Sequence, residues 1–414
     1  MAMRVEKHVI KKNNRYYPIL SDFCHLSKNL YNFANYHARQ GYIQTGHIPN
    51  YYDLEKLAKQ EPSTNNDYKS MPTAQAAQQT LRLLDKNWVS FKESSKDYKE
   101  NPGKYTGKPK MPKYLPKDGE YNLTLTNQNC KVKDSVIYFP KVFNGLTVKT
   151  EVIGKFQQVR IVPGNKHLVL EVIYKVETPE TLADNGRYMG IDIGLDNLAA
   201  IASNTGMTPV LINGKGLKSM NKYYNKRKSH YQEIAQRRNG LYNSNRMNDL
   251  TNRRCQRVND TMHKASKYIV NLAVKNDINT IIIGNNKDWK RESPLSKKIN
   301  QTFVGLPHQR IINMVSYKAE NAGIRVVLTE ESFTSGTSFL DREIPAREYY
   351  NKSRRVHRGL FVSNDGHKIN ADINASLQII KKVSPNAFSN GVEGMGLCPV
   401  VVNVSKFAIW PNLR

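Results

Sequence analysis

The second half of the chain alternates short apolar segments with long amphipathic ones, and this alternation limits the possible folds more than any other feature. A short apolar run bounded by turn residues is typical of a buried strand, whereas apolar residues three and four positions apart are typical of a helix. The segments are three strands within 187–214, long basic helices over 216–276, a buried strand at 278–285, a helix at 307–323, a strand at 324–331 and a final helix from Ala371.

This order of three strands, helix, strand, helix, strand and final helix predicts an RNase H-like α/β domain. The N-terminal half has a different pattern. After a short strand, residues 21–40 and 71–95 have apolar side chains at helical spacing, and residues 103–117 mix Gly, Pro, Lys and Tyr, as an extended connector does. Short apolar or alternating runs follow over 121–176, which predicts a small β-barrel or sheet. Since 414 residues exceed what one core usually organises, the expected fold class is multidomain α+β.

The charge of the chain limits its partners. There are 63 Lys and Arg against 35 Asp and Glu, a formal net charge of +28, and the pI is near 9.8. Such an excess of one sign favours a polyanionic partner, and nucleic acid is the main candidate. No run approaches the roughly 18 apolar residues of a membrane-spanning helix, and the N-terminus has no apolar signal core. We therefore expect no membrane partner and a cytoplasmic location, with the nucleoid in a prokaryote or the nucleus in a eukaryote.

Two aspartates lie where a carboxylate needs an explanation. Asp192 lies between Ile191 and Ile193 on a strand, so its side chain points away from theirs. A carboxylate there costs free energy unless it is exposed, hydrogen-bonded or bound to a metal. Asp372 lies at the start of a helix, where an anion or a metal-binding carboxylate is favoured. Taken alone, Asp192 is explained equally well as a turn-stabilising aspartate, and the segment with Asp372 is better explained as an ordinary N-cap.

Taken together, several segments resemble TnpB proteins, which are transposon-encoded RNA-guided endonucleases related to Fanzor proteins and type V CRISPR effectors. The resemblance comes from an ordered set of motifs rather than from one, and it covers most of the chain. The matching stretches include GIDIGLDNLAAIAS, INGKGLKSMNKYYNK, IIIGNNKDWK, NQTFVGLPHQRIINMVSYKAENAGI, EESFTS and RGLFVSNDGHKINADINAS, with the N-terminal Trp88-x-x-Phe91 and KPKMPKY.

The resemblance implies a particular domain organisation. An N-terminal helical bundle and a small β-barrel would precede an RNase H-like (RuvC) nuclease domain. The expected parts are a wedge-like β-barrel of residues 1–20 and 103–180, a helical recognition insertion of 21–102, a RuvC domain of 187–332 and 367–385, a degenerate zinc-ribbon-like insert of 333–366 and a C-terminal tail of 386–414.

By this resemblance, Asp192 matches the first RuvC acid and Asp372 the last. The common form of the family has a glutamate directly after the strand at 278–283, where this chain has Gly284. Either the nuclease is inactive, or a glutamate from a neighbouring strand end reaches the same metal, as in a rearranged variant of the family. The candidates for this middle acid are Glu331 first, Glu330 second and Asp288 or Asp341 last, with solvent-exposed acids beside a turn as the alternative.

The expected cofactors follow from these acids. Three carboxylates suit hydrolysis assisted by two Mg²⁺ or Mn²⁺ ions, with Asp192, Glu331 and Asp372 as catalytic residues and metal ligands. Family members usually carry a four-cysteine zinc ribbon, but residues 334–341 and 359–366 contain no cysteine. Structural Zn²⁺ is therefore not expected. The four cysteines of the chain lie far apart, at Cys24, Cys130, Cys255 and Cys398.

Basic side chains gather over 215–267, where one apolar helical face leaves the basic side free for phosphates. A solvated helical face is the alternative. The expected partners are a guide RNA from the transposon end and double-stranded target DNA with a short adjacent motif. The candidate nucleic-acid-binding residues are Lys222, Lys226, Arg227, Arg237, Arg238, Arg253, Arg254, Arg257 and Lys264.

Three functions follow from this reading. The first is an RNA-guided DNA endonuclease. The second is a nuclease-inactive RNA-guided DNA-binding repressor of the same fold, which Gly284 favours and the intact motifs around Asp192 and Asp372 oppose. The third is a transposase, or an accessory protein of one. Co-purification of an element-derived RNA would separate the guided functions from the third.

Overall fold

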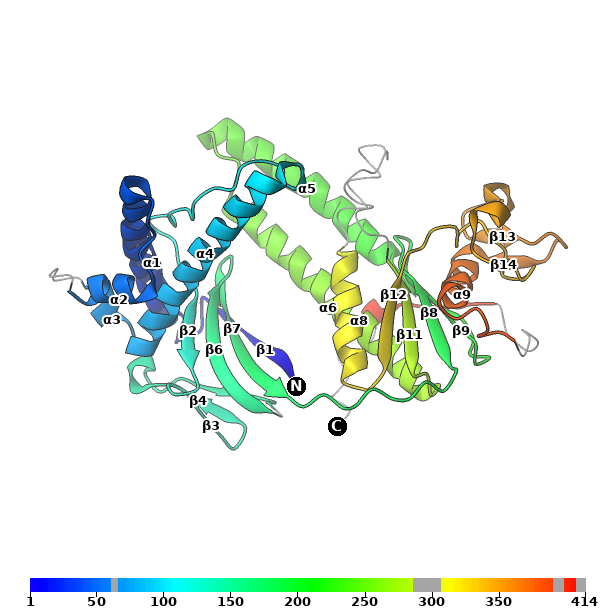
Figure 1. Ribbon diagram of the computed structural model, residues 1–414, viewed down its shortest axis with the longest axis horizontal. Helices are drawn as coiled ribbons and strands as arrows, with labels where there is room; N and C mark the ends of the chain where they lie inside the picture. The colour runs from blue at the N-terminus through cyan, green and yellow to red at the C-terminus, as the bar shows by residue number, and fades with distance from the viewer. Residues whose placement is uncertain (61–65, 153, 286–306, 390–397, 407–414) are drawn as a thin grey trace. The chain divides into compact units, whose positions relative to one another are not determined.

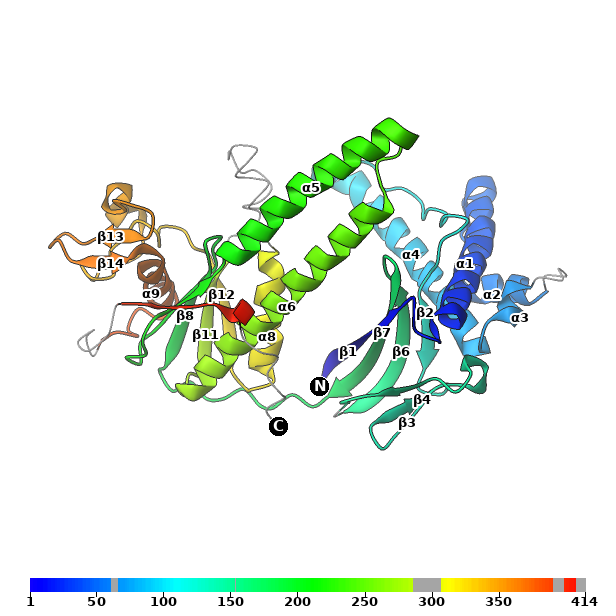
Figure 2. The same cartoon turned by 180° about the vertical axis from the view of Figure 1, so that it is seen from behind.

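The computed structural model describes residues 1–60, 66–152, 154–285, 307–389 and 398–406 of the chain. The protein is a mixed α/β protein that divides into two compact units, Met1–Glu177 and Thr178–Arg414 (Figure 1 and Figure 2).

The helical part of the first unit is built on two long helices, α1 (Tyr17–Thr45) and α4 (Ala74–Glu100). The shorter helices α2 (Tyr51–Gln60) and α3 (Asp67–Ser70) pack against both. Trp88 of α4 is fully buried, and its indole N–H donates a 3.1 Å hydrogen bond to Asn35 of α1. A buried tryptophan needs such a partner for its one polar group. The helices predicted over 21–40 and 71–95 are confirmed, and both are longer than the segments that predicted them.

Two sheets complete the first unit. The larger is antiparallel, in the order β1-β7-β6-β2, and the smaller is antiparallel in the order β3-β4-β5. The bounds are β1 Ala2–Lys11, β2 Leu123–Thr126, β3 Lys131–Lys133, β4 Val136–Tyr138, β5 Thr147–Lys149, β6 Lys155–Pro163 and β7 His167–Val176, with short 3-10 helices at Pro102–Lys104 and Lys141–Phe143.

The prediction that these strands close into a small barrel is wrong. In the residues that the structure describes, the larger sheet stays open, with β1 and β2 as its edges. Closure requires every strand to pair on both sides. β2 has only four residues, too few to pair along the ten-residue β1, and Met3, Val5 and Val9 of β1 remain exposed.

The second unit contains a six-stranded sheet in the order β12-β11-β8-β9-β10-β15. The strands β12, β11 and β8 are parallel, β9 is antiparallel to β8 and β10, and β15 is parallel to β10. The bounds are β8 Tyr188–Asp192, β9 Asn197–Ser203, β10 Val210–Asn213, β11 Thr280–Gly284, β12 Arg325–Thr329 and β15 Val400–Val402. β15 lies in the segment 386–414, which was expected to be a C-terminal tail, and its run of three valines is shorter than the other strands of this sheet.

Helices cover both faces of this sheet (Figure 1). Side chains of β11 alternate between the faces: Ile281 and Ile283 pack with α6 (Asn245–Lys275) and α8 (His308–Glu320), whereas Ile282 packs with α9 (Ala371–Val383). The helix α5 (Lys215–Asn239) forms a long hairpin with α6. The predicted order of strands and helices from residue 187 to the last helix is confirmed.

Residues 333–366, between β12 and α9, have little regular structure, and we call them the insert. They include 3-10 helices at Arg347–Tyr349 and Lys352–Arg354 and the strand β13 (Leu360–Val362), which pairs with β14 (Lys368–Asn370). Another 3-10 helix follows β15 at Val404–Lys406. Among the described residues, no helix has the length and apolar character needed to cross a membrane.

Candidate functional site

The first acid of the site lies at the end of a central strand. Asp192 is the last residue of β8, and its neighbours Ile191 and Ile193 belong to the core beneath α6 and α8. The side chain of Asp192 therefore faces α9, as the alternation of the strand predicts. Parallel strands present their carboxyl ends at one edge of a sheet, where side chains from different strands can meet.

A glycine allows α9 to approach this strand closely. A Cβ on Gly190 would lie 2.1 Å from the main-chain oxygen of Ser376, so no other residue fits there without movement of the backbone. The Ser376 hydroxyl lies 2.9 Å from the carbonyl oxygens of both Ala200 and Asp372 and shares its one proton between them. Because Ala200 is the register partner of Asp192, α9 is fixed beside the strand end that carries the first acid.

The second acid lies in the first turn of α9. The Asn370 side chain caps this helix by accepting hydrogen bonds from the main-chain N–H groups of Asp372 and Ile373, at 3.0 and 3.2 Å. The carboxylate of Asp372 has two further partners. Arg355 Nη2 lies 2.9 Å from its Oδ1, and Asn197 Nδ2 lies 2.8 Å from its Oδ2.

Glu331 occupies the space beside Gly284. Gly284 is the last residue of β11 and pairs in register with Thr329 of β12, two residues before Glu331. A Cβ on Gly284 would lie 2.5 Å from Glu331 Oε1 and 2.6 Å from its Cγ. Any side chain at position 284 would therefore displace the Glu331 carboxylate.

The three acids line one cavity of about 340 Å³, together with Asp196, Arg355 and Arg358. Burial raises the pKa of Asp192 well above its usual range, Glu331 and Asp372 raise it further, and Arg355 opposes them. Burial also raises the pKa of Glu331, to about 7. Carboxylates crowded in this way resist simultaneous ionisation unless a cation joins them.

The side chains fit a divalent cation in type and in charge. Carboxylate oxygens are the ligands that Mg²⁺ and Mn²⁺ prefer, and Asp192, Glu331 and Asp372 line the same cavity. In the described part of the chain, no three acidic, histidine or cysteine side chains are arranged closely enough to hold an ion as they stand. Both oxygens of Asp372 are engaged by Arg355 and Asn197, so this carboxylate would exchange a partner on binding a metal.

The other candidates for the middle acid lie elsewhere. Glu330 is exposed and does not line the cavity. Asp341 lies inside the insert, where its Oδ2 accepts a 3.0 Å hydrogen bond from the main chain of Asn364. Asp288 lies outside the described residues. The structure thus brings Glu331, and neither Glu330 nor Asp341, to the cavity with Asp192 and Asp372.

Three charged residues of the cavity were not predicted from the sequence: Asp196, Arg355 and Arg358. Asp196 accepts ion pairs from Lys218 at 2.7 Å and from Arg358 at 2.6 Å. Although burial opposes them, the Lys218 hydrogen bond and the Arg358 charge lower the pKa of Asp196. Both arginines come from the insert, whose irregular backbone gives no periodic signal by which their direction could be read.

The predicted nucleic-acid-binding residues lie along the α5–α6 hairpin, five on α5 and four on α6. Two of them partly serve the hairpin itself. Arg254 donates a 2.6 Å hydrogen bond to Asn221 and lies 4.9 Å from the ring centroid of Tyr224, and Arg227 lies 4.9 Å from that of Tyr231. The residues with exposed side chains are Lys222, Lys226, Arg237, Arg238, Arg253 and Arg257.

Two protein-family models match the segments of the chain that carry the acid cavity. The family model OrfB_IS605, described as a probable transposase, matches residues 171–290, and the model of the Cas12f1-like TNB domain matches residues 308–379. The first range contains Asp192 and Gly284, and the second contains Glu331, the insert and Asp372. No curated protein matches the sequence.

Solved structures with similarity to the chain include two nucleic-acid complexes. The chain is 15% identical to one from a Cas12f1–sgRNA–target DNA complex, over 91% of this chain and 98% of that one, with a TM-score of 0.36. It is 16% identical to one from a CRISPR-Cas12f ternary complex, over 87% of this chain and 81% of that one, with a TM-score of 0.37.

Proposed function

Since the chain is a TnpB/Cas12f-like family member, we propose that it is a TnpB-type RNA-guided nuclease that cuts DNA with its acid cavity. The observation that carries the proposal is the meeting of Asp192, Glu331 and Asp372 at one cavity, with Glu331 beside Gly284. A relocated glutamate explains how the chain retains three acids without one at the usual place. The sheet order, with three antiparallel strands continued by two parallel ones, supports an RNase H-like nuclease core.

In this proposal, the three carboxylates would hold two Mg²⁺ or Mn²⁺ ions. Bound metal supplies an activated water and stabilises the leaving oxygen of the phosphodiester. The residues of the chain contribute in other ways. Asp192 and Glu331 give two buried carboxyl groups, and burial raises the pKa of both. Asp372, in the first turn of α9 that Asn370 caps, gives the third carboxylate.

The partners in the proposal are a guide RNA from the transposon end and a double-stranded DNA target with a short adjacent motif. The net charge of +28 and the exposed lysines and arginines of the α5–α6 hairpin support polyanionic partners. Contacts of this kind hold phosphates without reading the base sequence, which the guide would read by pairing. Structural Zn²⁺ has no place in the proposal, because the insert contains no cysteine.

The test is to purify the protein with its RNA, sequence that RNA and add Mg²⁺ with a plasmid library that carries the matching target beside randomised bases. The proposal expects cut plasmids that share a short adjacent motif. If an RNA co-purifies and directs target binding without any cut, the repressor function replaces the nuclease. If no element-derived RNA co-purifies, a transposase or its accessory protein becomes the better account.

A further inference from the structure

The insert needs something other than an apolar core to hold its shape. Its buried aromatic residues are Phe339 and Phe361, which pack with the first turns of α9. A segment this short and irregular cannot bury enough apolar surface to fix its own fold, so such segments usually contain a metal, a disulfide or a polar network. The sequence of the insert has no cysteine.

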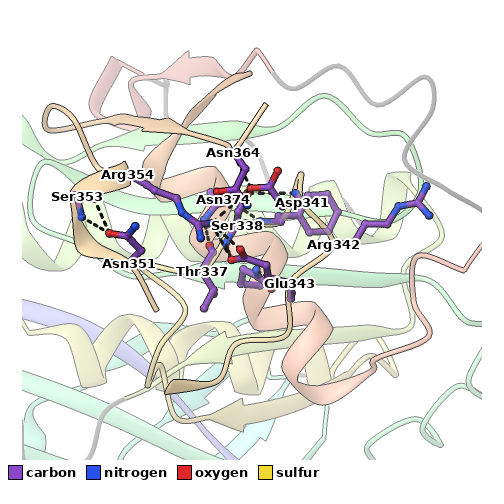
Figure 3. A network of polar contacts seen from close by, with 12 residues as sticks. Thr337, Ser338, Asp341, Arg342, Glu343, Asn351, Ser353, Arg354, Asn364 and Asn374 are labelled. Carbon is purple, nitrogen blue, oxygen red and sulfur yellow. Dashed lines mark hydrogen bonds and ion pairs between the residues drawn. The ribbon is translucent and has the colours of Figure 1, made fainter. Parts of the chain in front are cut away.

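A buried network of charged side chains lies at its centre (Figure 3). Arg354 Nη1 lies 2.8 Å from Oε1 and 2.9 Å from Oε2 of Glu343, and 3.5 Å from Oδ2 of Asp341. The exposed fractions of these side chains are only 15%, 9% and 9%. The acids in turn accept hydrogen bonds from the main chain of Ser338, at 2.7 Å, and of Asn364, at 3.0 Å. The network therefore joins the start, middle and end of the insert.

The same part of the insert is attached to α9. Asn374 of α9 donates to the carbonyl of Thr337 at 2.8 Å and accepts from the main-chain N–H of Phe339 at 2.9 Å. Gln378, one turn later, donates to the carbonyl of Glu343 at 3.2 Å. Since α9 begins with the residues that carry Asp372, the network and the third acid belong to one packed assembly.

The residue after Arg354 enters the acid cavity. Arg355 contacts Asp372 at 2.9 Å, and Arg358, three residues further, contacts Asp196 at 2.6 Å. Arg354 points into the insert, toward Glu343 and Asp341 (Figure 3). The two adjacent arginines therefore contact the network and the cavity from one short stretch of backbone.

The network is better explained as a device that fixes the position of the insert than as one that stabilises the fold. A buried ion pair adds little net stability relative to apolar side chains of similar size, because desolvation offsets the attraction. In the described structure, Arg354 Nε is also buried without a hydrogen-bond partner, which lowers the net gain further. What such a network does provide is one fixed geometry for the backbone that contains it.

We propose that Arg354 is a positioning residue: its ion pairs with Glu343 and Asp341 fix the insert on α9 and so hold Arg355 against Asp372. Arg355 then competes with a cation for this carboxylate. The inference rests on the proposed function only where it takes Asp372 as a metal ligand, and the first of two experiments is independent of that assumption.

The first experiment measures hydrogen–deuterium exchange in the full chain. Arg354→Met should speed exchange in peptides over 337–363 at least about tenfold, because it leaves buried carboxylates without their counter-charge. Arg347→Met removes the same charge from an exposed position of the insert and should leave exchange unchanged. Unchanged exchange in Arg354→Met would overturn the proposal.

The second experiment measures Mn²⁺ affinity by calorimetry in the RNA-bound protein. Arg355→Met should raise the affinity about tenfold, because it frees the Asp372 oxygen that Arg355 contacts at 2.9 Å and removes a positive charge that repels the cation. Arg354→Met should raise it similarly, and the double variant should equal Arg355→Met alone. Additive effects, or an unchanged affinity in Arg354→Met, would mean that Arg354 does not act through Arg355, and the proposal would fail.

Two precautions keep the outcomes distinct. If Arg354→Met does not fold, the triple variant with Glu343→Gln and Asp341→Asn removes the unpaired charges. It should still bind Mn²⁺ as Arg355→Met does, and wild-type affinity in it would overturn the proposal. If the wild-type protein binds no Mn²⁺ at all, the proposed metal site fails, and hydrogen exchange alone decides the role of Arg354.

Discussion

Gly284→Ala should slow cleavage about 100-fold while leaving the fold intact. The added Cβ would lie 2.5 Å from Oε1, 2.6 Å from Cγ and 2.9 Å from Cδ of Glu331, whereas ordinary contacts begin at 3.4 Å. The carboxylate must therefore retreat by about 0.9 Å. Displacing a reacting or metal-binding group by about 1 Å commonly costs about 100-fold in rate. We expect the cleavage rate to fall by about that factor.

The stability of the protein should change little. The atoms that must move belong to the end of a flexible side chain rather than to the backbone. Alanine also favours a strand over glycine by about 0.5–1 kcal/mol, which offsets part of the cost of repacking. The free energy of unfolding should therefore stay within about 1 kcal/mol of the wild-type value.

The assay is single-turnover cleavage of a guide-matched duplex, with thermal unfolding measured in parallel. Gly216→Ala is the matched control, because no atom lies within 4 Å of its added Cβ. Wild-type cleavage by Gly284→Ala would show that the position of the Glu331 carboxylate is irrelevant, and the reasoning would be refuted.

Three other predictions concern the acids and the metals. Glu331→Gln should abolish cleavage, whereas Glu330→Gln should reduce the cleavage rate much less because that side chain is exposed outside the cavity. If both variants cut at the wild-type rate, the hypothesis of a relocated catalytic glutamate is wrong. Elemental analysis of the purified protein should find no stoichiometric zinc, and chelators should stop cleavage without unfolding the chain, in contrast to a structural zinc module; one zinc per chain would contradict this. In chelator, the free energy of unfolding should fall as the pH rises from about 4.5 to about 7, because folded Glu331 binds its proton more tightly than the unfolded chain does. Glu331→Gln should flatten this dependence, and a slope equal to that of the wild type in urea titrations would assign it to another group.

The order of elements in the second unit could be predicted because its helices are long and periodic and its strands are short apolar runs between turn residues. The alternation of Ile191, Asp192 and Ile193 set the face of the first acid, and the buried run before Gly284 identified a central strand. The barrel prediction failed because the pattern of one segment does not show how distant strands pair. Short alternating strands indicate a sheet, but closure depends on strand lengths and on pairing between distant segments, and a four-residue β2 gives no local signal of either.

The charged partners of the cavity were beyond the reach of the sequence. Arg355 and Arg358 lie in an irregular segment, and their direction depends on the tertiary network around Arg354. The choice between Glu330 and Glu331 had the same difficulty. The turn after the strand decides which of two adjacent glutamates faces the cavity, and the sequence does not show the geometry of that turn. The contact between Glu331 and Gly284 is seen only in the structure.

The most direct test of the central claim compares binding and cutting in one reaction. Wild-type protein, Asp192→Ala and Asp372→Ala would each be loaded with the co-purified RNA and given its target duplex in Mg²⁺. The account predicts that all three bind the target with similar affinity and that only the wild-type protein cuts it. Mg²⁺-dependent cutting by either variant, or a wild-type complex that binds its target and never cuts, would contradict it.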